Sequence, residues 1–259
     1  MTPDDALREE PRMAQSNGSA LVTGGSRGIG RAIAVRLAQD GYDIGFCYQS
    51  AHDAAKETVR LVEAEGRRVY SEAVDVRDYE AVRGFVEAAQ SALGPVATAV
   101  ACAGTTRDHG LALMPPQDWS SVIGTNLDGA FHLARGVVLA MCRASRGSIV
   151  FVSSVSGIDG NAGQANYSAA KAGMHGLALS LAREVGRFGV RVNVVAPGLI
   201  DTDMLSTLSA KKREAARANI PLGKIGEPVH VADAVSFLAS EQAAYITGSI
   251  LRVDGGLRL

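Results

Sequence analysis

The stretch SALVTGGSRGIG, residues 19–30, decides the fold. Residues 20–23 are apolar or β-branched, as in a buried strand, and Gly28 opens a run with the apolar spacing of a helix. Glycines between a strand and a helix allow backbone amides to approach a pyrophosphate at the positive end of the helix. The stretch therefore predicts a strand, a phosphate-binding loop and a helix in succession.

The same alternation of short apolar runs and longer amphipathic runs continues along the chain. It predicts an α/β fold, a Rossmann-type doubly wound parallel sheet with helices on both faces. No linker or change of composition divides residues 18–259, so we expect a single domain. Strands are expected at residues 20–23, 44–48, 69–74, 96–101, 148–153, 191–195 and 250–253, and helices at 28–39, 51–65, 79–92, 126–143, 165–187 and 229–239.

Two segments depart from this alternation. Residues 1–17 are polar and aperiodic, and we expect them to form a disordered N-terminal tail. Residues 197–221 start with Pro-Gly, carry a polar run and stop at Pro221, which predicts a helical insertion at the carboxyl end of the sheet. Such an insertion is either a mobile lid over the site or an ordinary surface excursion, and the sequence favours neither.

Composition excludes several classes of function. Lys and Arg (26) nearly cancel Asp and Glu (27), so no global field draws the molecule to nucleic acid or to an anionic membrane. No apolar run reaches the roughly 18 residues that span a bilayer, and the N-terminus lacks the order of a secretory signal. The cysteines and histidines lack the spacing of a metal site, and we expect a cytoplasmic protein with reduced cysteines and with histidines in structural or surface roles. They are Cys47, Cys102, Cys142, His52, His109, His132, His175 and His230.

Tyr167 and Lys171 carry the strongest chemical signal. They lie four residues apart in a helical pattern, so both side chains share one helix face. The ammonium is expected to lower the pKa of the phenol towards neutrality. Ser154 ends an apolar strand thirteen residues before Tyr167. Ser153 is the adjacent alternative, but successive strand residues point to opposite faces, and the spacing to Tyr167 favours Ser154.

These motifs together resemble the short-chain dehydrogenase/reductase family. The loop has that family's T-G-x-x-x-G-x-G spacing, and the order Ser154, Tyr167-x-x-x-Lys171 is its active-site signature. Asn126 matches the fourth member of the site, and residues 193–198 and 254–256 also match. The resemblance runs from about Ser19 to the C-terminus and is strongest to 3-oxoacyl-[acyl-carrier-protein] reductases and related bacterial ketoreductases, through residues 165–173.

The resemblance implies NADPH-dependent reduction of a 3-oxoacyl thioester to the 3-hydroxyacyl product, in fatty acid or polyketide biosynthesis. Tyr167 would donate a proton to the carbonyl oxygen, and Ser154 would hydrogen-bond the same oxygen. Lys171 would bind the nicotinamide ribose, and Asn126 would hold a water that relays protons to Lys171. The implied coenzyme contacts are Thr23, Gly24, Ser26, Arg27, Gly28, Ile29, Gly30, Asp75, Val76, Ala103, Gly104, Tyr167, Lys171, Pro197, Gly198, Ile200 and Thr202.

The residues after the second strand favour NADPH over NADH. An NAD site would carry an acid there, and residues 47–50 (Cys-Tyr-Gln-Ser) contain none. Arg27, inside the glycine loop, suits a 2′-phosphate. Asp53 is the nearest acid, but its place predicts support for the first turn of the following helix.

The chain departs from the family pattern after the fourth strand. Where the family usually has Asn-Asn-Ala-Gly, this chain has Ala101, Cys102, Ala103 and Gly104. The retained Ala-Gly pair preserves close approach of the backbone to the coenzyme, so we expect activity. Cys102 is not expected to be a nucleophile, because no histidine with an orienting acid lies near it in sequence.

The resemblance also implies a homotetramer and an acyl carrier protein as partner. Arg143, Arg146 and Arg187 match the docking surface of related reductases by region, and the alternative is that they are solvated cations at helix ends. The apolar segment 248–259 is expected at a subunit contact. Two other functions are open: a dehydrogenase of the same family acting on an alcohol, sugar or steroid, and a non-catalytic dinucleotide-binding scaffold.

Overall fold

β1 (Ser19–Thr23), α1 (Gly28–Gln39) and β2 (Asp43–Tyr48) form the first unit of the computed structural model, which describes residues 16–206 and 210–257. Most of the expected tail lies outside these residues. Where the description begins, the Asn17 N–H donates to Gly41 O at 3.1 Å. The strand, loop and helix therefore succeed one another as the glycine stretch predicts.

The later elements follow the predicted alternation, and most of those with an expected range have bounds within a few residues of it. They are α2 (His52–Ala64), β3 (Val69–Ala73), α3 (Tyr79–Leu93), β4 (Val96–Ala101), the 3₁₀ turn η1 (Leu111–Leu113), α4 (Pro116–Ile123), η2 (Gly124–Asp128), α5 (Gly129–Arg143), β5 (Gly147–Val152), α6 (Ser156–Asp159), α7 (Ala165–Val185), η3 (Gly186–Phe188), β6 (Val190–Pro197), α8 (Asp203–Ser206), α9 (Ala210–Ala218), α10 (Pro228–Ala239), η4 (Glu241–Ala243) and β7 (Ile250–Val253).

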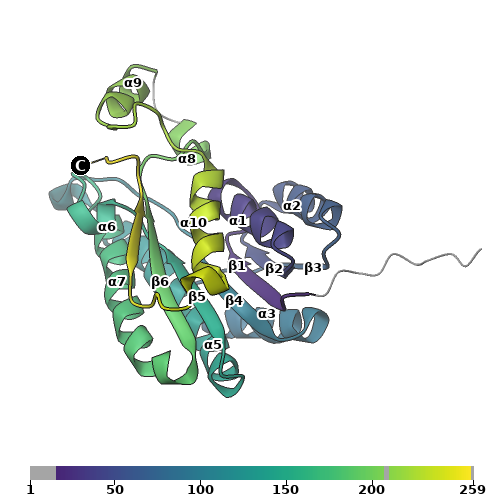
Figure 1. The fold of residues 1–259 in the computed structure, drawn as a ribbon. Helices are drawn as coiled ribbons and strands as arrows, with labels where there is room; N and C mark the ends of the chain where they lie inside the picture. Colours follow the sequence, from purple (N-terminus) through teal and green to yellow (C-terminus); the bar gives the residue numbers. More distant parts are fainter. Residues whose placement is uncertain (1–15, 207–209, 258–259) are drawn as a thin grey trace, which may run out of the picture.

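Within the described part of the chain, seven parallel strands form one sheet in the order β3-β2-β1-β4-β5-β6-β7 (Figure 1). The order reverses between β1 and β4, and in sheets of this kind ligands bind in the crevice outside the carboxyl ends at such a point. The fold is therefore the single-domain, doubly wound α/β architecture that the sequence predicts.

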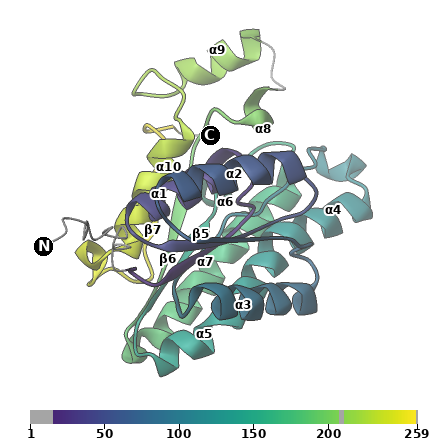
Figure 2. The same cartoon turned by 90° about the vertical axis from the view of Figure 1, so that its right-hand side faces the viewer.

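Helices cover both faces of the sheet (Figure 2). α3, α5 and α7 bury one apolar layer, in which Phe85, Leu133 and Met174 are inaccessible to solvent. α1, α2 and α10 bury the other, around Ile33 and Leu238. The two layers fix the strand ends, and with them the loops that carry polar residues.

The insertion after β6 is helical, as predicted, whereas the helical region before β5 starts earlier than expected. The long helical region begins at Pro116, ten residues before the expected start, and η2 within it is a π-helical turn. The expected insertion at 197–221 contains α8 and α9, which stand away from the sheet in Figure 1. Residues 207–209 of that insertion lie outside the described residues.

Among the residues that the structure describes, no helix has the length and apolarity needed to cross a membrane. The same residues contain no group of three or more His, Cys, Asp or Glu side chains that could hold a metal ion.

Asp43, at the start of β2, forms a buried ionic cluster with Arg67 and Arg68, and this cluster provides a test of the fold. The Asp43 side chain is 2% exposed and lies 3.1 Å from Arg67 Nη2 and 2.8 Å from Arg68 Nη2. Burial raises the pKa of Asp43, but hydrogen bonds from Arg68 outweigh it and hold the pKa below its usual value. The carboxylate thus ties the beginning of β2 to the segment before β3.

Replacing Asp43 by Asn should lower the free energy of unfolding by about 3 kcal/mol, because it removes the charge that balances buried Arg67. Asp53→Asn is the control, since Asp53 is 96% exposed beside Lys56 and its pair should contribute less than about 1 kcal/mol. Urea unfolding measures both. Equal losses of unfolding free energy in Asp43→Asn and Asp53→Asn would contradict this account.

Candidate active site

The glycines of the loop are required by close packing of the loop backbone and by its positive φ angles. Gly24 has φ of +71°, and a Cβ there would lie 2.8 Å from Ala103 Cα. A Cβ at Gly30 would lie 2.1 Å from Gly24 O, and Gly28 adopts φ of +54°. No side chain caps the N-terminus of α1. The first-turn amides therefore have no side-chain cap, and the start of a helix in this state suits a pyrophosphate.

Thr23 and Ser26 brace this loop from within. Thr23 Oγ1 accepts the N–H groups of Cys102 and Ala103, each at 3.1 Å, and so joins the ends of β1 and β4. Ser26 O accepts Arg31 Nη2 at 2.8 Å. Both predicted coenzyme residues are nearly buried, and these bonds fix the loop that would receive the phosphates.

The segment after β6 lies over the loop. A Cβ at Gly28 would sit 3.4 Å from Thr202 Cγ2, and Arg27 Nη1 lies 3.2 Å from Asp203 Oδ2 in α8. Ile200 is buried and bridges to Gly226. The structure thus brings Arg27, Ile200 and Thr202 to one side of the crevice, with Ile29 packed beneath on the α1 side.

At the end of β6, Pro197 O accepts the Val155 N–H and the Gly198 N–H donates to Val253 O.

Asp75, after β3, is clamped by two residues that sequence reasoning missed. Arg77 Nε lies 3.0 Å from its carboxylate, and Gln49 Nε2 donates to it at 3.3 Å. The hydrogen bond from Arg77 lowers the pKa of Asp75 to about 2. Val76 is buried, and its carbonyl accepts His132 Nδ1 at 2.8 Å. Nothing in the residue spacing shows that Gln49, which follows β2, meets Asp75 after β3.

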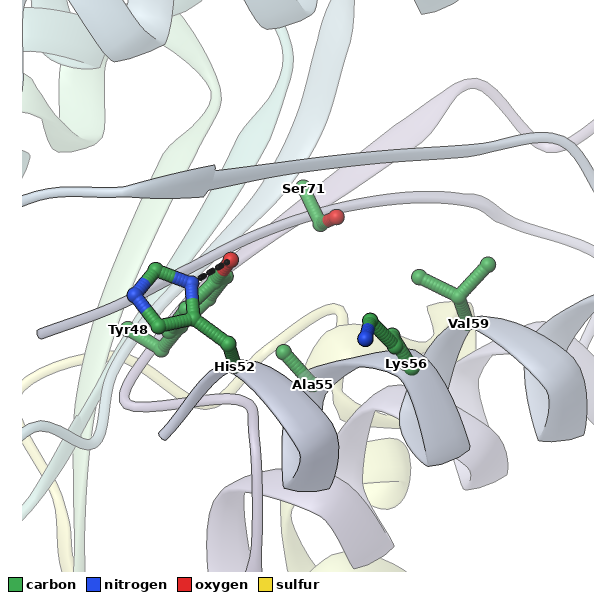
Figure 3. Close-up of a pocket in the computed structure, with 6 residues that line it drawn as sticks. All are labelled: Tyr48, His52, Ala55, Lys56, Val59 and Ser71. Carbon is green, nitrogen blue, oxygen red and sulfur yellow. Dashed lines mark hydrogen bonds between the residues drawn. The ribbon is translucent and has the colours of Figure 1, made fainter. Parts of the chain in front are cut away.

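A separate pocket of about 200 Å³ lies between the edge strand and α2 (Figure 3). Tyr48 Oη and His52 Nδ1 are 3.1 Å apart at its left side in the figure. None of the predicted catalytic or coenzyme residues lines it, so the pocket is not the catalytic site. Its lining residues are Tyr48, His52, Ala55, Lys56, Val59 and Ser71.

Ser154, Tyr167 and Lys171 meet at the carboxyl end of β5. Ser154 is 9% exposed, and its Oγ accepts the Ser156 N–H at 3.1 Å. Lys171 is 3% exposed, its Nζ donates to Val152 O at 2.8 Å, and the same Nζ lies 5.5 Å from the Tyr167 ring centroid. A phenol, a hydroxyl and an ammonium thus converge where a substrate carbonyl would reach them.

The pKa of Tyr167 differs from the sequence-based prediction. Burial raises the pKa of Tyr167 to about 12, against the opposing effect of a hydrogen bond with Ser154. Burial also lowers the pKa of Lys171 to about 8. The predicted lowering of the Tyr167 pKa is therefore wrong for this structure, because burial disfavours the charged phenolate and also disfavours the charge on the neighbouring lysine.

Asn126 lies in the π-helical turn, a feature that often occurs at functional sites. Its Nδ2 donates to Thr105 O and Val122 O, each at 2.9 Å, while its buried Oδ1 has no hydrogen-bond partner in the described residues. A Cβ at Gly104 would lie 2.8 Å from this oxygen and 3.6 Å from Lys171 Nζ. Both atoms therefore face one small space, which suits a bridging water.

Ser153 points away from Ser154, as strand alternation predicts. Its Oγ donates to Lys171 O at 3.0 Å and lies 2.8 Å from His175 Nε2. From the sequence, we expect His175 to be a structural or surface residue. The signal that could have singled it out is its position four residues after Lys171, on the same helix face.

The cysteines form no disulfide within the described residues. All three are free, Cys47 being fully buried and Cys102 and Cys142 partly buried. Burial raises the pKa of Cys102 to about 12, so this thiol stays protonated at neutral pH. The chemistry of Cys102 is therefore that of a small packing residue, in line with the sequence analysis.

The three arginines proposed for docking lie far from these residues in one chain. Arg143 ends α5, Arg146 precedes β5 and Arg187 lies in η3. A Cβ at Gly189 would lie 2.6 Å from Ser145 O, so the two segments are neighbours at the amino edge of the sheet. Ser154, Tyr167 and Lys171 lie at the carboxyl edge.

Comparison with known proteins agrees with this geometry. Residues 24–258 match the family described as enoyl-(acyl carrier protein) reductase. The 3-oxoacyl-[acyl-carrier-protein] reductase FabG of Staphylococcus aureus (strain Mu50) is 42% identical over 92% of this chain and 97% of its own length. The enzyme of that name from Escherichia coli (strain K12) is 44% identical over 92% and 96%. This chain belongs to the short-chain dehydrogenase/reductase family, and it is an oxidoreductase.

The lowered pKa of Lys171 predicts how coenzyme binding depends on pH. The ammonium is charged below about pH 8 and loses its proton as the pH rises through that value. NADPH affinity, measured by fluorescence titration from pH 7 to 10, should therefore fall at the alkaline end. Lys171→Ala should bind weakly with no such dependence. A wild-type affinity that stays constant to pH 10 would contradict the assignment.

Proposed function

We propose that this protein reduces a 3-oxoacyl thioester to the 3-hydroxyacyl product with NADPH, in fatty acid biosynthesis. The observation that carries the proposal is the convergence of buried Ser154 and Lys171 with the partly buried Tyr167, on the side of the glycine loop. Relatives named as 3-oxoacyl-[acyl-carrier-protein] reductases, which match over most of their length, support the same substrate class.

The residues present fit a nicotinamide dinucleotide phosphate. The glycine backbone and the uncapped start of α1 would hold the pyrophosphate. Arg27 would hold the 2′-phosphate, because its guanidinium is 64% exposed at the crevice and no acid follows Tyr48 within the next two residues. Lys171 would hold the nicotinamide ribose, and bound NADPH would supply the hydride.

Three side chains then perform the proton chemistry. The Ser154 hydroxyl donates a hydrogen bond to the substrate carbonyl oxygen and so fixes its direction. Tyr167, which the raised pKa keeps protonated at neutral pH, gives its Oη proton to that oxygen. Lys171, at 5.5 Å from the phenol ring, stabilises the negative charge that develops there. A water on Asn126 Oδ1 would resupply the proton through Lys171.

A pocket of about 610 Å³, lined in part by residues 159–162 of the segment that follows Ser154, is the space that we propose for the acyl thioester. It is formed by the end of α6, the start of the β6–α8 segment and the last described residues. Arg252 joins these walls, since its guanidinium lies 2.8 Å from Asp159 Oδ2 and donates to Leu257 O at 2.7 Å. The pocket lining mixes amide, carboxylate and apolar side chains: Asp159, Gly160, Asn161, Ala162, Leu199, Asn219 and Leu257.

Tyr167→Phe tests the proposed function most simply. It should abolish NADPH oxidation with a 3-oxoacyl thioester while leaving NADPH affinity nearly intact, because only the proton donor is lost. Tyr245→Phe, at a fully exposed tyrosine, is the control and should keep its rate. If the Tyr167→Phe variant kept even a tenth of the wild-type rate, another group would be the acid.

The same assay with simple ketones, secondary alcohols and a 2-enoyl thioester separates the alternatives. NAD-linked alcohol oxidation that exceeds thioester reduction would favour the dehydrogenase alternative. Reduction of the enoyl thioester alone would overturn the proposal.

Arg27→Ala tests the choice of coenzyme. The wild type should prefer NADPH over NADH by about tenfold or more, the effect of one charge-assisted contact of roughly 1.5 to 3 kcal/mol. The variant should lose most of this preference through weaker NADPH binding, with NADH affinity unchanged. Arg60→Ala, at an exposed arginine of α2, is the control. A wild type that prefers NADH would contradict the assignment of Arg27.

A carrier-protein partner, a homotetramer and a cytoplasmic location belong to the same proposal. Exposed apolar side chains on α5, α7 and β7, among them Leu139, Leu179 and Leu251, support subunit contacts. Since Arg143, Arg146 and Arg187 lie at the amino edge, they would serve the site of a neighbouring subunit. Fractionation of cells tests the location.

Reversing Arg143 and Arg187 to Glu should raise KM for a carrier-bound substrate by about tenfold and spare a small thioester analogue, because only the carrier presents acidic side chains. Light scattering at micromolar concentration should give a tetramer mass for the wild type. Equal effects on both substrates, or a monomer, would remove docking across subunits from the proposal.

A further inference from the structure

Lys171 is fixed to β5 at both of its ends. Its ammonium donates to Val152 O at 2.8 Å, and its backbone carbonyl accepts Ser153 Oγ at 3.0 Å. Val152 and Ser153 are consecutive, so one turn of α7 is held at two points against the end of one strand. The backbone at Gly157 packs on the same turn, since a Cβ there would lie 2.8 Å from the Lys171 carbonyl carbon.

Ser153 is itself held from two further sides. Its N–H donates to Val195 O of β6 at 2.8 Å, and its Oγ lies 2.8 Å from His175 Nε2. The serine has one hydroxyl proton, which it gives to Lys171 O, so His175 Nε2 is the donor in the other bond. Burial, together with the charge of Lys171, lowers the pKa of His175, so the imidazole is neutral at neutral pH.

We propose that His175 and Ser153 are positioning residues for Lys171. The hydrogen bonds run from His175 to Ser153 and from Ser153 to the Lys171 carbonyl, and they fix the backbone from which the ammonium reaches Tyr167 and the coenzyme ribose. This inference rests on the proposed function, because it assigns the pair to the lysine that would bind the coenzyme.

The side chain of Lys171 needs such a support. A lysine stem has four rotatable bonds, and the ammonium must offer N–H groups to ribose oxygens as well as to Val152 O when the coenzyme is bound. A fixed backbone then keeps Nζ within hydrogen-bond reach of the ribose oxygens and of Val152 O. Functional groups whose geometry is fixed by surrounding residues hold their ligands in a better-defined position. Loss of the support should therefore weaken coenzyme binding first.

Ser148 offers a matched control for a merely structural role. It lies at the other end of β5, is 2% exposed and donates its Oγ proton to Leu238 O at 3.0 Å. Residue type and kind of hydrogen bond are thus the same as for Ser153, which directly follows this strand. Ser148→Ala should lower stability and leave NADPH affinity unchanged.

The test compares Ser153→Ala, His175→Leu and His175→Gln with wild type and Ser148→Ala. NADPH dissociation constants come from fluorescence titration, and unfolding in urea reports stability. Ser153→Ala and His175→Leu should each weaken NADPH binding by about threefold to tenfold, the effect of one lost hydrogen bond. His175→Gln, whose amide N–H can replace the Nε2 donor, should bind NADPH close to the wild-type level.

The double variant Ser153→Ala, His175→Leu should bind NADPH no more weakly than Ser153→Ala alone, because the two residues act in series. Wild-type affinity in His175→Leu, no rescue by Gln, or a Ser148→Ala variant that weakens NADPH binding equally would each overturn the proposal. These outcomes are judged from NADPH dissociation constants and not from the rate of reduction. A wild type that binds NADPH but reduces no 3-oxoacyl thioester would therefore count against the proposed function and leave this inference intact.

Discussion

A buried ammonium needs a partner, and Lys171 finds one in the carbonyl of Val152 at the end of β5. This hydrogen bond fixes the position of α7 relative to β5, and that position places Tyr167 beside Ser154. If the helix were turned or shifted by one residue, the phenol would leave the serine. The close backbone contact at Gly157 belongs to the same constraint, because any side chain there would push α7 away from the strand.

The glycine loop forms the coenzyme side of the site, and its position also depends on close packing of backbone atoms. Gly24 lies against Ala103, and Thr23 holds the loop after β4 through two backbone N–H groups. In the same loop, Gly104 lies close to Asn126 Oδ1 and Lys171 Nζ. The coenzyme side and the catalytic side are therefore joined through one short segment, whose backbone N–H groups make these contacts whatever side chain residue 102 carries.

Local patterns were sufficient for the strands, for most of the helices and for the pairing of Tyr167 with Lys171 on one helix face, because β-branched runs, helical spacing and glycine turns are properties of neighbouring residues. The roles of Ser154 and Asn126 were expected from the resemblance to the family. Contacts between distant residues could not be read in this way. The clamp of Gln49 and Arg77 on Asp75, and the pair of Ser153 with His175, depend on how strands and helices pack. The direction of the Tyr167 pKa depends on burial, which only the folded chain defines. The π-helical turn at Asn126 likewise has no local signature.

Isotope transfer tests the central claim, that this site delivers hydride to the 3-oxo carbon while Tyr167 protonates the oxygen. The enzyme would be given NADPH carrying deuterium at both C4 positions of the nicotinamide and a 3-oxoacyl thioester, and the product analysed by mass spectrometry and NMR. The account predicts one deuterium at C3 of a 3-hydroxyacyl thioester in the wild type. Unlabelled product, or deuterium incorporated only when a 2-enoyl thioester is the substrate, would contradict it.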